Sequence, residues 1–375
     1  MRFEQDKNIV KNGHEIHVIS CRTFGAPAYE KAEGIETYRI PAITLPVLEY
    51  PFFNLLLLYS WAAKLVERHD IDVVHVEDGA YLTSLLVLMV KKLLRKPVVL
   101  SMQGFPGISW FYGNALVDLV GKLYTLTLGR AVLKTADMVV LSTTAYVDDA
   151  LRLGVPKNRL KVIPRGVDPK RFFPHQKTRQ LTRKRLNAKD DEIIILFAGR
   201  LVPVKGLDYF IDAAKILVRK NRKLLFIIAG DGILRGKFEA ETRNLRSNIR
   251  FIGHRQDMPD VMNAADIFVL SSVSEGFPNT VLEASACAKP VISTKVGGAN
   301  DIILDGETGF LIERCDVADL CNALEQVLSD MPQAAKMGLK ALPRMLEHFT
   351  WDSVVSRWEN VYSEIANSSQ QRGKN

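Results

Sequence analysis

Cysteine is scarce in this sequence of 375 residues, which has only four: Cys21, Cys287, Cys315 and Cys321. No two of them form a Cys-x-x-Cys pair, and no histidines cluster beside them. Such usage excludes a disulfide-stapled small domain and offers no zinc site built on thiolates. We therefore predict reduced thiols in a cytoplasmic protein without a zinc site.

Long hydrophobic runs are also missing. The longest are residues 54–66, interrupted by Lys64, and residues 80–90, which end before Lys91 and Lys92. Each falls well short of the roughly 20 residues that a membrane-spanning helix needs. The first seven residues are too polar for the apolar core of a signal peptide. We expect no membrane-spanning segment and no export by that route.

Several sequence motifs are absent as well. The sequence has no Gly-x-Ser-x-Gly elbow of a serine hydrolase. Its nearest approach to the dinucleotide fingerprint, residues 230–236, misses the last glycine spacing by one residue. Lys and Arg outnumber Asp and Glu by 50 − 42 = 8, but these charges are scattered and match no nucleic-acid-binding motif. A serine hydrolase, a nicotinamide dehydrogenase and a nucleic-acid partner are therefore disfavoured.

The chain does have the apolar residues that large cores need, at 47%, and a length typical of about two domains. Strand-like and helix-like segments alternate, which predicts parallel sheets covered by helices. The predicted strands are residues 15–20, 72–76, 97–102, 138–141 and 160–163, followed by 193–198, 224–229, 249–252, 267–270 and 291–294. The predicted helices of the first half are residues 54–68, 81–94, 115–134 and 143–153. The basic stretch of residues 168–185 is predicted to be a connector with solvated charges.

Open parallel sheets bind ligands beyond the carboxyl ends of their strands, so the loops there are the candidate sites. Residues 199–206 form one such loop and place Arg200 and Lys205 close to a helix N-terminus, where anions bind readily. The loop suits a phosphate group, with two ordinary surface charges as the alternative. Residues 295–300 are either a second phosphate cradle or a plain turn.

Residues 274–284 are the most informative stretch. Glu275 lies in the loop after strand 267–270, and Glu283 is predicted in the first turn of the next helix, so both carboxylates face one crevice. For Glu283 the alternative is a capping box with Thr280. For Glu275 the alternative is a solvated loop carboxylate. The Asp-x-Asp at residues 70–72 precedes a strand, so it sits at the wrong sheet edge for a metal-nucleotide site.

Together these motifs resemble retaining glycosyltransferases of family 4. The second half carries them in order: Gly199-Arg200 with Lys205-Gly206, Gly230-Asp231-Gly232, Phe251-Ile252-Gly253, Glu275 and Glu283 spaced as Glu-x7-Glu, Pro290-Val291-Ile292, Gly297-Gly298, and residues 305–309. The first half is similar more loosely, at residues 12–15, 72–75 and 163–168. Family members usually open with a strand and a glycine-rich loop, which this chain is expected to lack.

The resemblance implies an α/β protein of the GT-B fold, with two Rossmann-like, doubly wound parallel-sheet domains facing a cleft. Residues 1–172 would bind the acceptor and residues 173–349 the donor, and a last helix in residues 350–375 would pack back on the first domain. The implied reaction moves a hexosyl group from a UDP- or GDP-linked sugar to a glycan or lipid-linked acceptor hydroxyl. It keeps the anomeric configuration and needs neither a metal nor another cofactor.

The same resemblance assigns site residues. Arg200 and Lys205 would hold the diphosphate and Glu275 the sugar hydroxyls. Glu283 would bind the ribose, and Gly253 and His254 would lie along the base. The other donor contacts would come from Gly199, Gly230, Asp231, Gly276, Phe277, Pro278 and Asn279, and the acceptor contacts from Asp78, Gln103 and Gly104.

Two rival functions remain open on the sequence: a nucleotide-sugar epimerase on the same fold, and a non-catalytic nucleotide-sugar-binding protein. Membrane contact is open too. Residues 55–58 with Trp61, and the basic residues 91–96, either rest on the inner face of a membrane that carries a lipid-linked acceptor or form buried helix faces with solvated ends.

Overall fold

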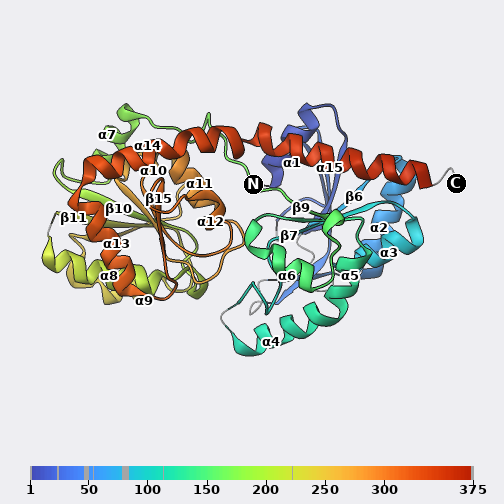
Figure 1. The fold of residues 1–375 in the computed structure, drawn as a ribbon, viewed down its shortest axis with the longest axis horizontal. Coiled ribbons are helices and arrows are strands. Elements are labelled where there is room, and N and C mark those ends of the chain that lie inside the picture. The colour runs from blue at the N-terminus through green and yellow to red at the C-terminus, as the bar shows by residue number, and fades with distance from the viewer. Residues whose placement is uncertain are drawn as a thin grey trace. The chain divides into compact units, whose positions relative to one another are not determined.

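The computed structural model of the chain describes residues 2–22, 25–45, 50–53, 55–77, 84–112, 114–221 and 223–372 (Figure 1). It divides into two compact units, each with its own sheets and helices. The first unit combines Met1–Pro164 with Trp351–Asn375, and the second is Arg165–Thr350.

The first unit is built on four parallel strands in the order β6-β7-β8-β9. These are β6 (Val74–Glu77), β7 (Val98–Met102), β8 (Met138–Leu141) and β9 (Leu160–Val162). A separate sheet has the order β1-β3-β2, with β1 (Ile16–Cys21) parallel to β3 (Ile35–Ile40), and β2 (Tyr29–Ala32) antiparallel to β3. Strands β4 (Ala42–Leu45) and β5 (Tyr50–Phe53) pair antiparallel. Its helices are α1 (Arg2–Lys11), α2 (Leu55–Arg68), α3 (Leu85–Met89), α4 (Ala115–Tyr124), α5 (Arg130–Thr135), α6 (Val147–Arg152) and α15 (Trp351–Arg372).

Helices cover both faces of this four-stranded sheet. Side chains alternate along a strand, so the neighbours Val99 and Leu100 of β7 face opposite sides. Leu100 belongs to a buried cluster with residues of α2, α3, α5 and α6, whereas Val99 packs with Val354 and Trp358 of α15. The final helix of the chain is therefore part of the first unit, where it seals one face of the sheet.

The second unit holds six parallel strands in the order β12-β11-β10-β13-β14-β15. They are β10 (Ile193–Ala198), β11 (Leu224–Ala229), β12 (Ile249–Gly253), β13 (Ile267–Leu270), β14 (Val291–Thr294) and β15 (Gly309–Ile312). The helices are α7 (Gln176–Arg185), α8 (Leu207–Lys220), α9 (Arg235–Glu241), α10 (Met258–Ala264), α11 (Asn279–Ala286), α12 (Ala299–Ile302), α13 (Val317–Ser329) and α14 (Met331–His348). The chain builds outward from β10 to β12 and then returns to the other side of β10 as β13, so the strand order reverses between β10 and β13.

The central strands of the second unit are apolar on both faces because helices cover both. Ile195 and Phe197 of β10 pack in a cluster with residues of α8 and α13. Ile194 and Leu196, which point the other way, pack with residues of α10, α11 and α14. This double cover makes the sheet a rigid platform for the loops at its edges.

The basic stretch before β10 is not the solvated connector that the sequence suggested. Residues 176–185 form α7, and Arg179 and Arg183 both bind the carboxylate of Asp266, at 2.5 and 2.9 Å. Arg179 Nη1 also donates to the carbonyls of residues 263–265, at the end of α10. Two of the predicted solvated charges therefore hold helices together.

The boundary between the units lies after Pro164, eight residues before the predicted position at residue 172. The Val167 N–H donates to the Phe349 carbonyl at 2.8 Å, and Val167 also forms a β-bridge with Thr350. Phe172 is buried in the same cluster as Phe349. Residues 165–172 are thus fixed to the second unit by backbone hydrogen bonds and apolar packing.

Candidate donor site at the sheet edge of the second unit

The carboxyl ends of the parallel strands of the second unit share one edge of the sheet, and the loops that follow them gather there. The predicted donor residues lie in the loops after β10, β11, β12 and β13, at the end of β12 or in α11. The reversal of strand order between β10 and β13 places the loops after these two strands next to each other. This position is the usual ligand site of an open parallel sheet.

Lys205 and Glu275 meet at this reversal point. Lys205 Nζ lies 2.6 Å from Glu275 Oε1, and Ser272 Oγ donates to the same carboxylate oxygen at 2.7 Å. Glu275 is only 6% exposed, while the Lys205 side chain is 20% exposed. The sequence alternative of a solvated Glu275 is therefore wrong: the carboxylate is buried and held by two loops.

Glycines let these loops approach closely. Gly206 has a φ of +61°, and a Cβ there would lie 2.0 Å from the Ser271 carbonyl oxygen. Gly230, with a φ of +143°, would place a Cβ 1.8 Å from the Gly199 carbonyl oxygen. The Gly230 N–H donates to the Gly253 carbonyl at 2.8 Å. Backbone contacts thus join the loops after β10, β11, β12 and β13 into one surface.

The loop after β14 packs on the Glu275 loop. The Gly298 N–H donates to the Gly276 carbonyl at 2.9 Å, and a Cβ on Gly298 would meet the Phe277 ring at 2.1 Å. Phe277 itself is 4% exposed and lies near the Phe349 ring, so its side chain belongs to the core. Among the described residues, nothing accepts the backbone N–H groups of Gly276 or Phe277. At Phe277, therefore, a ligand can contact the backbone but not the side chain.

Pro278, not Thr280, occupies the N-cap position of α11, so the alternative of a capping box between Thr280 and Glu283 is wrong. Because the helix begins at Asn279, Glu283 lies in its second turn rather than its first. Its carboxyl makes no hydrogen bond or ion pair within the described part of the chain. Burial raises the pKa of Glu283 to about 7, against the opposing charge of Arg171. A half-buried carboxyl without a partner is suited to bind a ligand hydroxyl.

Further polar and charged side chains lie at this edge of the sheet. Asn279 Oδ1 is buried without a hydrogen-bond partner among the described residues. Asp231 accepts from the Gly232 N–H at 2.8 Å and from Arg235 at 2.8 Å, and these contacts hold its pKa below the usual range. Arg200 and His254 are exposed in neighbouring loops.

The predicted acceptor residues fall in the first unit. Gln103 is half-buried and directly follows β7, so it lies at the carboxyl end of that strand. Gly104 is buried, and a Cβ on it would touch Trp110 at 3.1 Å. Asp78 lies outside the described residues, directly after β6.

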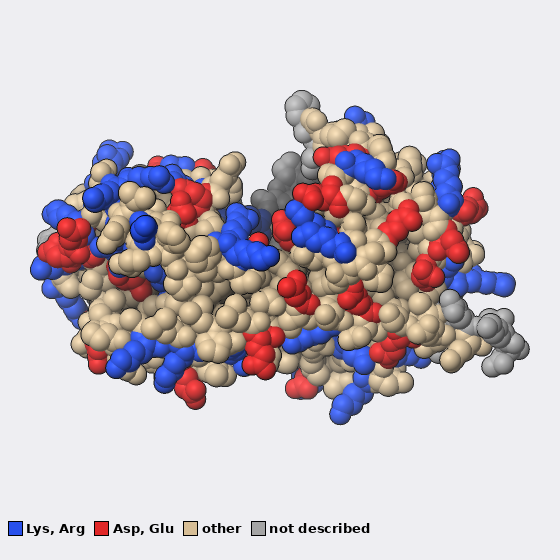
Figure 2. Space-filling view, turned by 90° about the horizontal axis from the view of Figure 1, so that it is seen from above, with Lys and Arg blue, Asp and Glu red and all other residues tan. Residues whose placement is uncertain are grey.

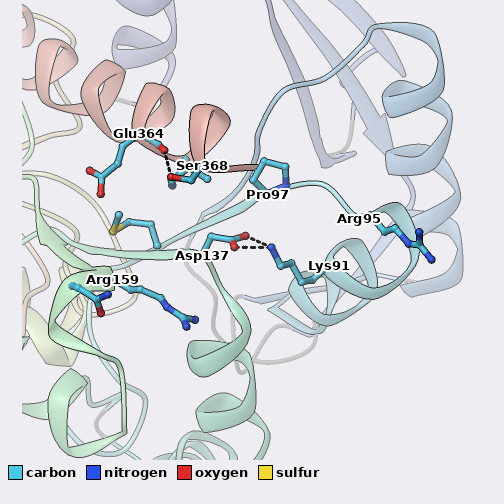
Figure 3. A pocket seen from close by; sticks show the side chains of 10 residues that line it. Lys91, Arg95, Pro97, Asp137, Arg159, Glu364 and Ser368 are labelled. Carbon is cyan, nitrogen blue, oxygen red and sulfur yellow. Dashed lines mark hydrogen bonds and ion pairs between the residues drawn. The ribbon is translucent and has the colours of Figure 1, made fainter. Parts of the chain in front are cut away.

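A pocket of 430 Å³ opens at the edge of the first unit's sheet where the strands begin, opposite the edge where Gln103 lies (Figure 3). Its lining includes Lys91, Asp137, Arg159 and Glu364. Asp137 and Arg159 precede β8 and β9, at the amino ends of the strands. Lys91 Nζ contacts both carboxylate oxygens of Asp137 at 2.6 Å. The predicted donor and acceptor residues lie elsewhere.

Helix α2, one candidate for membrane contact, turns Leu57, Leu58 and Trp61 toward the core, whereas Leu56 is 73% exposed. Leu58 is 6% exposed, and Leu57 and Trp61 pack against the cluster around β7. Helix α4 has the exposed apolar face: Leu116, Leu119, Val120 and Leu123 are exposed by 70%, 53%, 52% and 57%. Across the described residues, no helix combines the length and apolarity that crossing a membrane requires. On the face in Figure 2, cationic and anionic side chains alternate rather than forming one basic patch.

Two family models match this sequence. Residues 178–342 match the model described as glycosyl transferases group 1, and residues 7–171 match the model described as glycosyltransferase family 4. The first match contains the loops that build the sheet edge of the second unit.

Individual proteins are similar as well. An uncharacterized glycosyltransferase of Methanocaldococcus jannaschii is 27% identical, covering 95% of this chain and 91% of the relative. The UDP-Gal:alpha-D-GlcNAc-diphosphoundecaprenol alpha-1,3-galactosyltransferase of Escherichia coli is 32% identical, covering 71% of this chain and 69% of the relative. Among solved structures, a sucrose-phosphate synthase from Thermosynechococcus elongatus aligns with a TM-score of 0.82 at 20% identity, over 97% of this chain and 92% of that one.

Proposed function

This chain belongs to the glycosyltransferase family described as glycosyl transferases group 1, with the GT-B fold, and on that premise we propose a retaining hexosyltransferase. In this proposal a hexosyl group moves from a UDP- or GDP-linked sugar to the hydroxyl of a glycan or lipid-linked acceptor. The similar Escherichia coli protein is named for a UDP-sugar donor and a diphosphoundecaprenol-linked acceptor.

The donor binds along the sheet edge of the second unit. Lys205 and Arg200 hold the diphosphate, Glu275 and the free N–H groups of Gly276 and Phe277 bind the sugar hydroxyls, and Glu283 binds the ribose. Gly253 and His254 lie along the base, while Gly199, Gly230, Asp231, Pro278 and Asn279 shape the surrounding surface. The contact of 2.6 Å between Lys205 and Glu275 carries the proposal, because it brings a cation and a sugar-binding carboxylate from two loops to the strand reversal point.

The reaction requires stabilisation of the leaving group. As the bond from the anomeric carbon to the diphosphate breaks, negative charge develops on the phosphate oxygen, where fixed cations stabilise it. A unit charge pair at 4 Å contributes about 4 kcal/mol at an effective dielectric constant of 20. Lys205 and Arg200 together thus supply what a metal would otherwise supply, and no cofactor takes part. The acceptor hydroxyl attacks the same face of the sugar and gives its proton to the departing phosphate oxygen.

Turnover of labelled nucleotide sugars tests the assignment. Wild-type protein is incubated with UDP- and GDP-linked hexoses and candidate acceptors, products are detected by mass, and the anomeric configuration is read by NMR. Lys205→Ala and Glu275→Ala should each lower kcat/KM by at least about 100-fold. Lys215→Ala is the matched control, because Lys215 of α8 pairs with Asp212 of the same helix and with Glu241 of α9, away from the site.

The same assay separates the rival functions. An epimerase would return an altered sugar still joined to its nucleotide, and a non-catalytic protein would bind the donor without releasing nucleotide. Wild-type rates in both site variants would refute the donor-site assignment.

A lipid-linked acceptor would require contact with a membrane surface, which we assign to α4. Its exposed residues Leu116, Leu119, Val120 and Leu123 follow the i, i+3, i+4, i+7 spacing of one helix face. The protein should co-sediment with anionic phospholipid vesicles, and Leu119→Ser with Leu123→Ser should reduce the bound fraction. Equal sedimentation of the double variant would contradict this assignment.

A further inference from the structure

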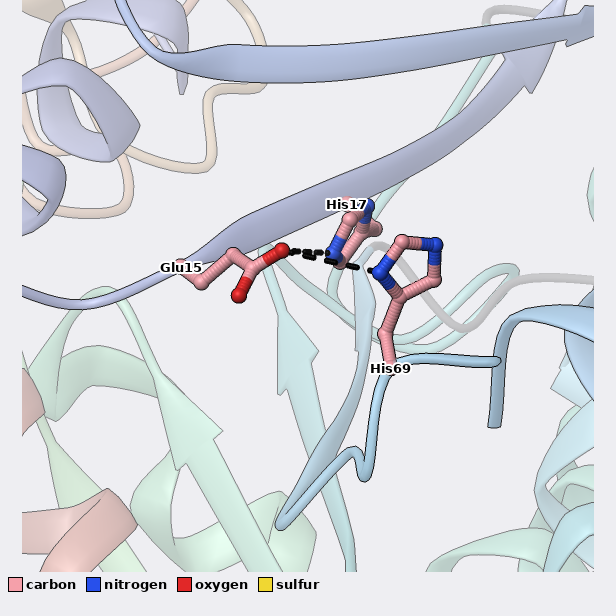
Figure 4. Close-up of side chains that lie close together, drawn as sticks. All are labelled: Glu15, His17 and His69. Atoms are coloured by element: carbon pink, nitrogen blue, oxygen red, sulfur yellow. Dashed lines mark hydrogen bonds and ion pairs between the residues drawn. The ribbon is translucent and has the colours of Figure 1, made fainter. Parts of the chain in front are cut away.

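Two histidines and a glutamate lie together in the first unit, in a cluster that glycosyl transfer does not use (Figure 4). Glu15 directly precedes β1, His17 is the second residue of β1, and His69 follows α2. The three ligand atoms that they offer all lie within 4.8 Å of one another. Three side chains from two distant segments thus converge on one point.

The distances within this cluster fit a small cation. Glu15 Oε1 lies 2.8 Å from His17 Nε2 and 3.6 Å from His69 Nδ1. Ligand atoms around a tetrahedral zinc ion lie about 3.3 Å apart, given metal–ligand distances of about 2.0–2.1 Å. These two separations fall on either side of that value, and the ligand nitrogens of His17 and His69 lie within 4.8 Å of each other.

A second carboxylate, that of Glu36, lies on the other side of the His17 ring. His17 Nδ1 lies 3.4 Å from Glu36 Oε2, which is its neighbour in the pairing of β1 with β3. Hydrogen bonds from Lys31 and Tyr38 lower the pKa of Glu36 to about 2, so this carboxylate is charged. Metal-binding histidines commonly donate their second ring N–H to such a carboxylate. In this structure Nδ1 is buried without a hydrogen-bond partner among the described residues, so Glu36 lies close to the ring but is not bonded to it.

The Glu15 side of the cluster is open to solvent, whereas the His17 side is buried. His17 Nε2 lies 2.8 Å from Glu15 Oε1, and when Nε2 carries the ring proton it donates to that oxygen. The His17 side chain is only 2% exposed, so solvent does not separate them, whereas Glu15 is 72% exposed and gives access from one side. In the tautomer that carries its proton on Nδ1, a metal cation can take the place of the Nε2 proton between the two atoms.

We propose that Glu15, His17 and His69 bind a first-row divalent metal ion, with Zn²⁺ as the best fit and Glu36 as a positioning residue. Two imidazoles and one carboxylate form a ligand set that zinc uses, with a fourth position left for water. Magnesium and calcium prefer oxygen ligands and fit poorly. The site lies at the amino end of β1, so its role is to tie β1 to the segment after α2 rather than to react with the sugar.

Calorimetry with ZnCl₂ tests the proposal on the full chain. All proteins carry Cys315→Ser, because the exposed Cys315 thiol would bind zinc by itself. The protein that keeps Glu15, His17 and His69 should bind one equivalent of zinc, and the bound zinc should raise the midpoint temperature of thermal unfolding. MgCl₂ should neither bind there nor raise this midpoint. His69→Ala and Glu15→Gln should weaken binding by at least about 100-fold, and Glu36→Gln by about 10- to 100-fold.

His14→Ala is the matched control. This residue lies next to Glu15 but pairs with Glu359 at 3.2 Å, so its loss should leave zinc affinity unchanged. X-ray absorption of the zinc complex should show two imidazole ligands. Absence of a one-to-one complex in the wild type, or equal affinity in His69→Ala and wild type, would overturn the site. A proton would then bridge Glu15 and His17 instead.

Discussion

Lys205 and Glu275 are coupled, because each supplies the charge that the other needs in a partly buried place. Lys205→Ala leaves the Glu275 carboxylate, 6% exposed, with Ser272 but without its cation. We expect this variant to lose about 1–3 kcal/mol of unfolding free energy. The double variant Lys205→Ala with Glu275→Gln should lose less than the sum of the single changes, by about 0.5–3 kcal/mol. Urea denaturation of the four proteins measures this coupling, and strictly additive losses would contradict it.

Glu283 should reduce stability at neutral and alkaline pH. Its pKa is raised to about 7 in the folded protein, from 4.5, so the folded state holds its proton more tightly than the unfolded state does. By linkage, its contribution to stability is full below pH 4.5 and is lost as pH rises through 7. The upper bound of this loss is about 3 kcal/mol.

Glu283→Gln should therefore match the wild type at pH 5 and exceed it by about 1–3 kcal/mol at pH 8. Urea unfolding at the two pH values measures the difference. A pH-independent difference between the two proteins would show that the carboxyl is not buried in the way described.

At the scale of loops and helices, the close approach of the loops after β10 and β11 depends on Gly230. An alanine there would place its Cβ 1.8 Å from the Gly199 carbonyl oxygen at a φ of +143°. Gly230→Ala should lose at least about 2 kcal/mol of unfolding free energy, through strain and overpacking. Gly236→Ala in α9, where nothing lies within 4 Å, should instead gain about 0.5–1 kcal/mol. Chemical denaturation measures the unfolding free energy of both variants. Similar changes in the two would refute the argument that the loops pack closely at Gly230.

The elements that the sequence predicted best are those with uninterrupted apolar runs. Strands β10, β11, β13 and β14 have the predicted bounds, because both faces are covered and each run ends at a turn. Strands β2 to β5 and helix α1 were not predicted. Strand β2, for example, has a burial pattern that is exposed at three of four positions, so no apolar period marks it.

The residues of the candidate site also differ in how well the sequence predicted them. Glycines and charges at strand ends revealed the loops of the second unit, because backbone geometry restricts the sequence there. The contact between Lys205 and Glu275 joins loops 70 positions apart, which no local pattern encodes. The cluster of Glu15, His17 and His69 was missed for the same reason: Glu-x-His gives only a weak signal until the fold brings His69 beside it.

At the scale of the whole molecule, the chain leaves the first unit after residue 164 and returns to it at Trp351. The returning helix α15 packs on the sheet through Trp358, which is 4% exposed and stacks on Tyr362. Trp358→Ala should cost about 3–5 kcal/mol, whereas Asn360→Ala, on the exposed side of the helix, should be near neutral. Thermal unfolding compares the two. Equal midpoints would mean that α15 contributes little to the first unit.

The central claim is that cations at the strand reversal point of the second unit hold the donor diphosphate. Titration of UDP and GDP by calorimetry tests it most directly, in the wild type, Lys205→Ala and the control Lys215→Ala. A charge-assisted hydrogen bond contributes about 1.5–3 kcal/mol, so Lys205→Ala should bind the preferred nucleotide at least about tenfold more weakly. Lys215→Ala should bind it like the wild type. Unchanged affinity in Lys205→Ala would contradict the account.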